Sequence, residues 1–83
     1  MRTVRLEHQA SQSLDHCKAK FGRFDEVYQG LEWLLARNPL QGFDLGGNLR
    51  VCFQTAQWAQ TPGILAVFSH TANEVVIYDL KAI

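Results

Sequence analysis

The sequence has no excess of charge of either sign. Its 83 residues include eight Lys and Arg and eight Asp and Glu, so the formal net charge is zero. A strongly basic chain is the usual electrostatic mark of a nucleic-acid-binding protein, and this chain lacks it. A local basic face is still compatible with zero net charge, because phosphate contacts depend on where the cations lie as well as on their number.

Cysteines and long apolar runs are also few. Cys17 and Cys52 have neither metal-ligand spacing nor a C-x-x-C arrangement, which predicts two free thiols in a reducing cytosol. The opening residues 1–5, "MRTVR", lack the apolar core of a signal peptide. Apolar runs such as residues 64–68 are much shorter than a segment that spans a bilayer. We therefore expect a cytoplasmic protein that does not contact a membrane and holds no metal or cofactor.

The composition is that of one small folded domain, residues 1–83. The apolar fraction of 47% is ordinary for a folded chain and too high for a disordered one. A chain of this length buries roughly 60–65% of its unfolded surface, so little apolar area is left over. We find no repeat and no low-complexity segment in the sequence.

The N-terminal residues predict a short strand and then a helix. Val4 and Leu6 alternate with charged residues, and this period of two is typical of a strand with one buried face. Ser11 and Ser13 are candidate N-caps for a helix that ends near Lys20.

The clearest periodicity in the chain lies between residues 24 and 35. Six apolar residues recur there at helical spacing: Phe24, Val27, Tyr28, Leu31, Leu34 and Leu35. Arg37 lies in the last turn, where its positive charge interacts favourably with the helix dipole. Pro39 disfavours the helical conformation at Asn38. With a short break at Gly22, the two helices are expected to form an antiparallel hairpin.

The second half of the chain predicts three strands, at residues 49–54, 64–70 and 75–83. The last two are apolar on both faces, as expected of strands near the middle of a sheet. The order is therefore strand, helix, helix, strand, strand, strand, which belongs to the α+β class. We expect a β-α-α-β-β-β arrangement with the helix hairpin packed on one face of a mainly antiparallel sheet.

The face that each strand presents decides where the charged residues lie. We expect the apolar alternate residues of the first of these strands to face the helices: Leu49, Val51 and Phe53. On the closing strand we expect the same of one apolar set: Val76, Tyr78, Leu80 and Ala82. Arg50, Asp79 and Lys81 would then share the open face of the sheet.

The stretch "LEWLLARNPLQG" leading to "GGNLRVCF", together with the closing "VVIYDLKAI", resembles the RelE/ParE superfamily, the toxins of bacterial type II toxin–antitoxin systems. The matching positions are Pro39, Gly46-Gly47, Arg50 and Lys81. The resemblance covers nearly the whole chain in element order. It implies a RelE-like fold, in which the first strand lies parallel to the last, and a cognate antitoxin as the main protein partner.

In the RNA-cleaving branch of this superfamily, the open sheet face binds messenger RNA on the ribosome. Cations hold the scissile phosphate while a base activates the ribose 2′-hydroxyl. The resemblance therefore implies an mRNA endoribonuclease, an mRNA interferase, that needs no cofactor. Its catalytic candidates are Arg50, Lys81, Asp79 and His70. Its candidate RNA-binding residues are Arg50, Lys81, Lys18, Lys20 and Arg23.

Two features depart from the RNA-cleaving branch and keep other hypotheses open. Members of that branch are usually basic, and a tail beyond the last strand often supplies a catalytic residue, whereas only Ala82 and Ile83 follow Lys81 here. The alternatives are a ParE-like inhibitor that binds DNA gyrase without a catalytic set, and a non-toxic relic that retains antitoxin binding. Trp33 and Trp58 are further candidates for partner contact, although core packing explains such residues more often.

Overall fold

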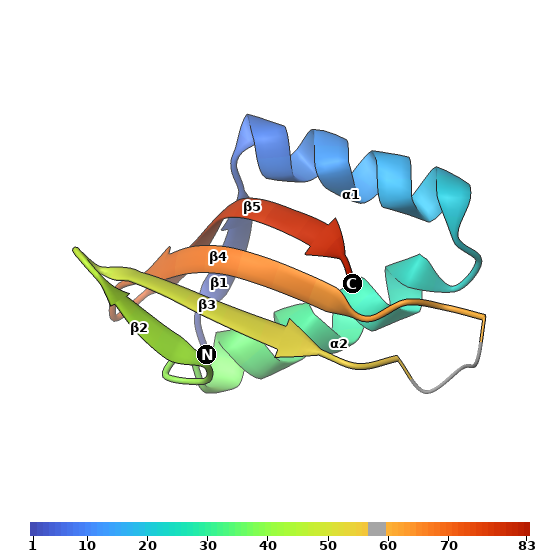
Figure 1. Ribbon diagram of the computed structural model, residues 1–83. Coiled ribbons are helices and arrows are strands. Elements are labelled where there is room, and N and C mark those ends of the chain that lie inside the picture. Colours follow the sequence, from blue (N-terminus) through green and yellow to red (C-terminus); the bar gives the residue numbers. More distant parts are fainter. Residues whose placement is uncertain (57–59) are drawn as a thin grey trace.

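The computed structural model describes residues 1–56 and 60–83 and shows an α+β domain (Figure 1). Its elements are β1 (Thr3–Leu6), α1 (His8–Lys20), α2 (Phe24–Arg37), β2 (Phe43–Gly46), β3 (Leu49–Gln54), β4 (Ile64–His70) and β5 (Glu74–Ala82). The expected class is confirmed. The short strand β2 was not expected, although Phe43 and Leu45 alternate with Asp44 before the Gly46-Gly47 turn, which is the pattern of a β-hairpin.

The strands form one sheet in the order β1-β5-β4-β3-β2. β1 pairs with β5 in parallel, and the other neighbours are antiparallel. Residues 75–77 of β5 are therefore flanked on both sides, as predicted, by β1 and β4. Because β1 contains only four residues, the rest of β5 pairs with β4 alone within the described chain.

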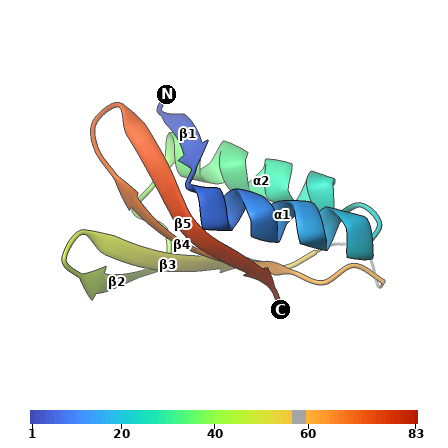
Figure 2. The same cartoon turned by 90° about the horizontal axis from the view of Figure 1, so that it is seen from above.

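Both helices lie on the same side of the sheet and run in opposite directions (Figure 2). The predicted start of α1 was wrong, because the helix begins at His8 and neither Ser11 nor Ser13 caps it. The backbone N–H of Glu7 donates to the Ile77 carbonyl at 2.9 Å. Glu7 thus ends the pairing of β1 with β5, and the helix starts at the next residue.

The predicted α2 is confirmed in its length and in the face that it buries. It begins after Arg23, which has a left-handed backbone with φ of 62°, and it ends at Arg37. The backbone N–H of Asn38 donates to the Leu34 carbonyl at 2.7 Å. Five of the six predicted apolar residues are buried: Phe24, Val27, Tyr28, Leu31 and Leu35.

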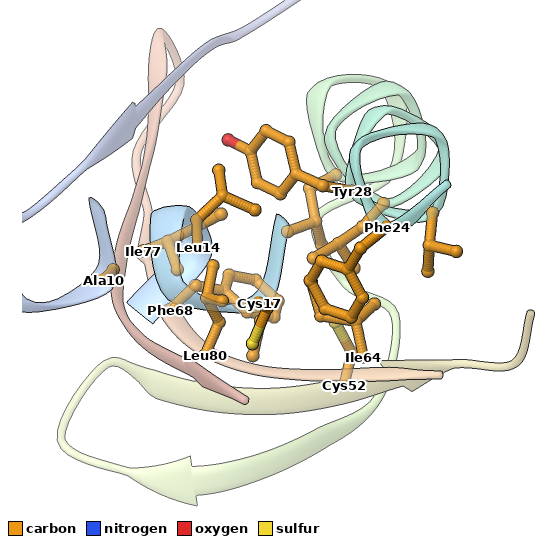
Figure 3. Close-up of a cluster of buried hydrophobic side chains, with 14 of the residues drawn as sticks. Ala10, Leu14, Cys17, Phe24, Tyr28, Cys52, Ile64, Phe68, Ile77 and Leu80 are labelled. Atoms are coloured by element: carbon orange, nitrogen blue, oxygen red, sulfur yellow. The ribbon is translucent and has the colours of Figure 1, made fainter. Parts of the chain in front are cut away.

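The core lies between the helix pair and the sheet (Figure 3). The helices and the inner strands contribute the side chains that their period places inward, and burial of a large one such as Phe24 or Leu31 stabilises the fold by about 1.5–3 kcal/mol. The helices contribute Ala10, Leu14, Cys17, Phe24, Val27, Tyr28, Leu31 and Leu35. The sheet contributes Cys52, Ile64, Ala66, Phe68, Val75, Ile77 and Leu80.

The predicted faces of β3 were wrong. Cys52 is 4% exposed and belongs to the core, whereas Phe53 is 57% exposed on the open face. The close approach of α2 explains this phase: a Cβ atom at Gly30 would lie 2.7 Å from Nε2 of Gln54. The limited space between α2 and β3 holds the unbranched side chains of Cys52 and Gln54. Because side chains alternate along a strand, Phe53 then points to the open face.

The predicted faces of β5 were right for only half of the strand. The register shifts between Val67, which lies opposite Asp79, and Phe68, which lies opposite Ile77. Tyr78 is therefore an extra residue, a β-bulge, and the strand changes phase there. Ahead of the bulge the odd-numbered Val75 and Ile77 are in the core, and after it the even-numbered Leu80 and Ala82 face inward. Tyr78 is 40% exposed, and its hydroxyl lies 2.9 Å from Oγ of Ser69.

The two faces of the sheet are expected to differ strongly in their contribution to stability. Phe68 is fully buried, so Phe68→Ala should lower the free energy of unfolding by about 3–5 kcal/mol. The matched variant Phe53→Ala, on the open face, should cost less than about 1 kcal/mol. Urea unfolding of both variants measures the difference, and a larger loss in Phe53→Ala would contradict the observed phase of β3.

Burial also makes the stability depend on pH through Cys52. Desolvation raises the pKa of the Cys52 thiol to about 11, because burial disfavours the thiolate. The unfolded chain releases this proton near its ordinary pKa of about 8.5. The stability from Cys52 is therefore complete below that value and is lost as the pH rises towards 11.

We expect the free energy of unfolding to fall between about pH 8.5 and 10, with a slope of up to about 1.4 kcal/mol per pH unit. Cys52→Ala should remove this slope, whereas Cys17→Ala, which leaves Cys52 in place, should keep it. Urea unfolding at several pH values tests this. An unchanged slope in Cys52→Ala would assign the effect to another group.

Candidate functional site

The residues expected to form one site on the open face are divided between the two faces of the sheet. Asp79 lies opposite Val67 and Lys81 lies opposite Leu65, so both are on the open face as predicted. Arg50 lies opposite Phe68, which is fully buried under the helices. Arg50 therefore lies on the helix side of the sheet, and the predicted common face of Arg50 and Lys81 was wrong. The cause is the reversed phase of β3.

Arg50 holds the segment that connects α2 to β2. Its Nη2 donates to the carbonyl of Leu40 at 2.8 Å and to that of Gly42 at 3.4 Å. Its Nη1 lies 4.0 Å from Oδ2 of Asp44, and only 16% of the side chain is exposed. Gly42 has φ of +85°, and a Cβ atom there would overlap the carbonyl oxygen of Val51. The connection thus passes directly against β3, and the guanidinium group fixes it there.

Two of the four catalytic candidates do come together. His70 ends β4 and lies opposite Val75, so it is on the helix side of the sheet, as Arg50 is. Both line a cavity of about 420 Å³. The other lining residues come from β2, the turn after it and the connection from α2: Leu40, Asp44, Gly46, Gly47 and Asn48. A cation, an imidazole and a carboxylate therefore meet at the β2–β3 end of the sheet.

The chemistry of this cavity is limited by the contacts that Arg50 already makes. Its Nη2 is occupied by two backbone carbonyls, and its buried Nε has no hydrogen-bond partner among residues 1–56 and 60–83. A phosphate group would have to compete with these carbonyls for Nη2 or with Asp44 for Nη1. The first role of Arg50 is therefore structural.

The remaining candidate RNA-binding residues lie at the far end of the molecule. Lys18 and Lys20 are in the last turn of α1, at the opposite end from the β2–β3 turn (Figure 1). Nζ of Lys20 lies 5.3 Å from the ring centre of Phe21, and Nε of Arg23 lies 3.7 Å from Oε2 of Glu26. The five candidates thus do not form one basic surface.

The open face instead presents apolar side chains, among them Leu49, Val51 and Phe53, which were expected to face the helices. We call this surface the open-face patch; it consists of Phe43, Leu49, Val51, Phe53, Leu65 and Val67. Phe43 is 66% exposed, Phe53 is 57% exposed and Leu49 is 37% exposed. No described helix or strand covers this side of the sheet (Figure 2).

The strand register arranges five of the six residues of the open-face patch in two rows across the sheet, and Leu49, which lies opposite Gly46, is outside both rows. The first row is Phe43–Val51–Val67 and continues to Asp79 on β5. The second row is Phe53–Leu65 and continues to Lys81. Each apolar row therefore ends in one charge, and the two charges have opposite signs. A contiguous exposed apolar surface with a polar border is typical of a protein-binding site.

Trp33 borders this surface, because it lines a cavity of about 540 Å³ together with Phe53. Trp33 is 58% exposed, but it lies on α2, and its ring is under the guanidinium group of Arg37 at 4.1 Å. The predicted contact of Trp58 falls outside the described residues.

Comparisons with known proteins identify no family for the chain. No protein-family model matches the sequence, and no curated protein is significantly similar to it. Within the described residues, no group of three or more His, Cys, Asp and Glu side chains is placed to bind a metal ion. Neither of the two helices is long and apolar enough to span a membrane.

The structural role of Arg50 predicts a clear difference between the two cations. Arg50→Met keeps the aliphatic stem and removes the donors to Leu40 and Gly42, which should lower the free energy of unfolding by about 1.5–3 kcal/mol. Lys81→Met changes an exposed side chain and should stay within about 0.5 kcal/mol of the wild type. Urea unfolding measures both. Equal stability of the two variants would show that the carbonyl contacts of Arg50 contribute little and leave its guanidinium group available to a ligand.

Proposed function

We propose that the chain is a domain of the RelE/ParE type, from a bacterial type II toxin–antitoxin system, and that it works by protein contact through the open-face patch. Its principal partner is a cognate antitoxin. The observation that carries the proposal is an exposed apolar sheet face, bordered by Asp79 and Lys81. The layout is compatible with this family, since a helix pair covers one face of a mixed sheet whose first strand is parallel to its last.

A protein partner suits this face better than RNA. Interface centres are enriched in aromatic residues and depleted of charge, as in the patch around Phe43 and Phe53. A face that binds the nucleic-acid backbone needs several cations, and here Arg50 is on the other side of the sheet. The zero net charge of the chain agrees with this choice. Protein contact covers two of the earlier alternatives, gyrase inhibition and a non-toxic antitoxin-binding domain.

The end of β5 gives the antitoxin a second point of attachment. After residue 77, β5 has no paired strand on the β1 side within the described chain, so an extended segment can add to the sheet there, beside α1. Lys81 lies along this edge and also lines a cavity of about 320 Å³ against α1, with Gln9, Gln12, Ser13, His16, Cys17 and Leu80. A small neutral or acidic antitoxin that combines an apolar surface with an extended segment fits both features.

Ribosome-dependent mRNA cleavage is the second candidate function, favoured by the cavity that Arg50 shares with His70. In this proposal His70 accepts the proton of the ribose 2′-hydroxyl, and Arg50 stabilises the developing charge on the phosphate. The partners are then the ribosome and mRNA, and Asp79 and Lys81 take no part in the chemistry because they lie on the opposite face.

Co-expression of the tagged chain with the product of the neighbouring gene tests the first proposal. The wild type should co-purify with that product, and Phe53→Glu should lose it, because a carboxylate in the apolar patch is costly to bury. Ala19→Glu is the control, since it places the same carboxylate at an exposed position of α1. Capture that is equal in both variants would place the antitoxin elsewhere.

Inducible expression of the same variants without antitoxin separates the activities. Growth arrest with DNA damage and intact messages indicates gyrase inhibition, and no arrest from folded protein indicates the non-toxic domain. Codon-phased mRNA ends that are lost in His70→Ala would instead support cleavage at the Arg50–His70 cavity.

A further inference from the structure

The open-face patch has a symmetry that the antitoxin proposal does not use. The row that ends in Asp79 and the row that ends in Lys81 are neighbours along the strands, two residues apart on β5. Val67 and Leu65, on β4, belong to the same two rows. The patch thus contains two neighbouring apolar rows with opposite charges at the same end, of which the first is longer by Phe43.

A two-fold axis that crosses the strands midway between the rows would exchange them. Each row of one copy would then lie over the other row of the second copy. Asp79 would face Lys81 of the second copy, and Lys81 would face its Asp79. On the neighbouring strands Val67 would face Leu65, and Val51 would face Phe53. A closed two-fold interface needs such self-complementarity.

We propose that two copies of the chain associate face to face through their open-face patches, about this axis. The sheets would pack as in a β-sandwich, about 10 Å apart and with strand directions within about 30° of each other. The helix pairs would lie on the outside. The proposal goes beyond antitoxin binding and concerns the free protein.

Charge decides between this arrangement and the alternatives. A two-fold axis parallel to the strands would place β5 of one copy over β2 of the other, with Asp79 and Lys81 against apolar side chains such as Phe43. Burial of unpaired charges is strongly unfavourable. The axis across the strands pairs both charges at the border of the interface, where a polar rim is usual. The zero net charge of the chain removes long-range repulsion between two copies.

Sedimentation equilibrium of the purified chain, without antitoxin, tests the proposal. The wild type should be a reversible dimer in the micromolar to submillimolar range. Phe53→Glu should raise the dimer Kd by at least about thirtyfold, as for a central aromatic residue. Ala19→Glu, at an exposed position of α1, should leave the Kd unchanged. A monomeric wild type, or a dimer that Phe53→Glu does not weaken, overturns the proposal.

Charge reversal tests the axis and remains informative should Phe53→Glu fail to fold. Asp79→Lys alone and Lys81→Asp alone place like charges opposite each other, and each should raise the Kd about three- to tenfold. The double variant, Asp79→Lys with Lys81→Asp, should restore the wild-type value. Absence of this restoration overturns the arrangement. Antitoxin binding is judged separately by co-purification, so a monomeric chain that captures its antitoxin overturns only self-association.

Discussion

The packing of α2 against β3 at Gly30 is the constraint on which both faces of the sheet depend. The helix lies so close to the strand that Gln54 reaches the position of the missing Cβ atom, and Cys52 fills the core beside it. A strand has a period of two, so this single contact assigns every side chain of β3 to a face. It places Arg50 on the helix side and Phe53 in the open. The cavity and the apolar patch both follow from it.

The parts of the fold that the sequence could predict are those in which one periodicity dominates. The apolar stripe of α2, its end before Pro39 and the central position of β5 follow from helical spacing, proline geometry and apolar runs, and the structure has all three. The phase of β3 could not be predicted, because apolar size favours Phe53 inside and only the distance to α2 excludes it. The bulge at Tyr78 has no signal in the sequence, since residues 76, 78, 80 and 82 are all apolar and favour one unbroken phase along the strand. The candidate site was therefore only partly predictable: Asp79 and Lys81 were placed correctly, and Arg50 was not.

The separation of the cations changes which functions the molecule can support. A phosphate site needs cations that converge on one point, and here the nearest approach to such a point is the cavity shared by Arg50 and His70. The surface available for recognition is instead apolar, with one acid and one base at its border. Binding to such a surface would depend on shape complementarity and on the relative positions of Asp79 and Lys81. That makes protein contact the stronger proposal.

The parallel pairing of β1 with β5 has a consequence for how the chain folds. The side chain of Arg2 donates to the carbonyl of Thr71, 69 residues away in the sequence, and Thr3 lies opposite Glu74. During synthesis β1 has no partner until β5 has left the ribosome, and β5 also carries Val75, Ile77 and Leu80 of the core. Loop closure over such a distance slows folding. The emerging chain therefore exposes its apolar residues until β5 arrives, and it is open to aggregation during this interval.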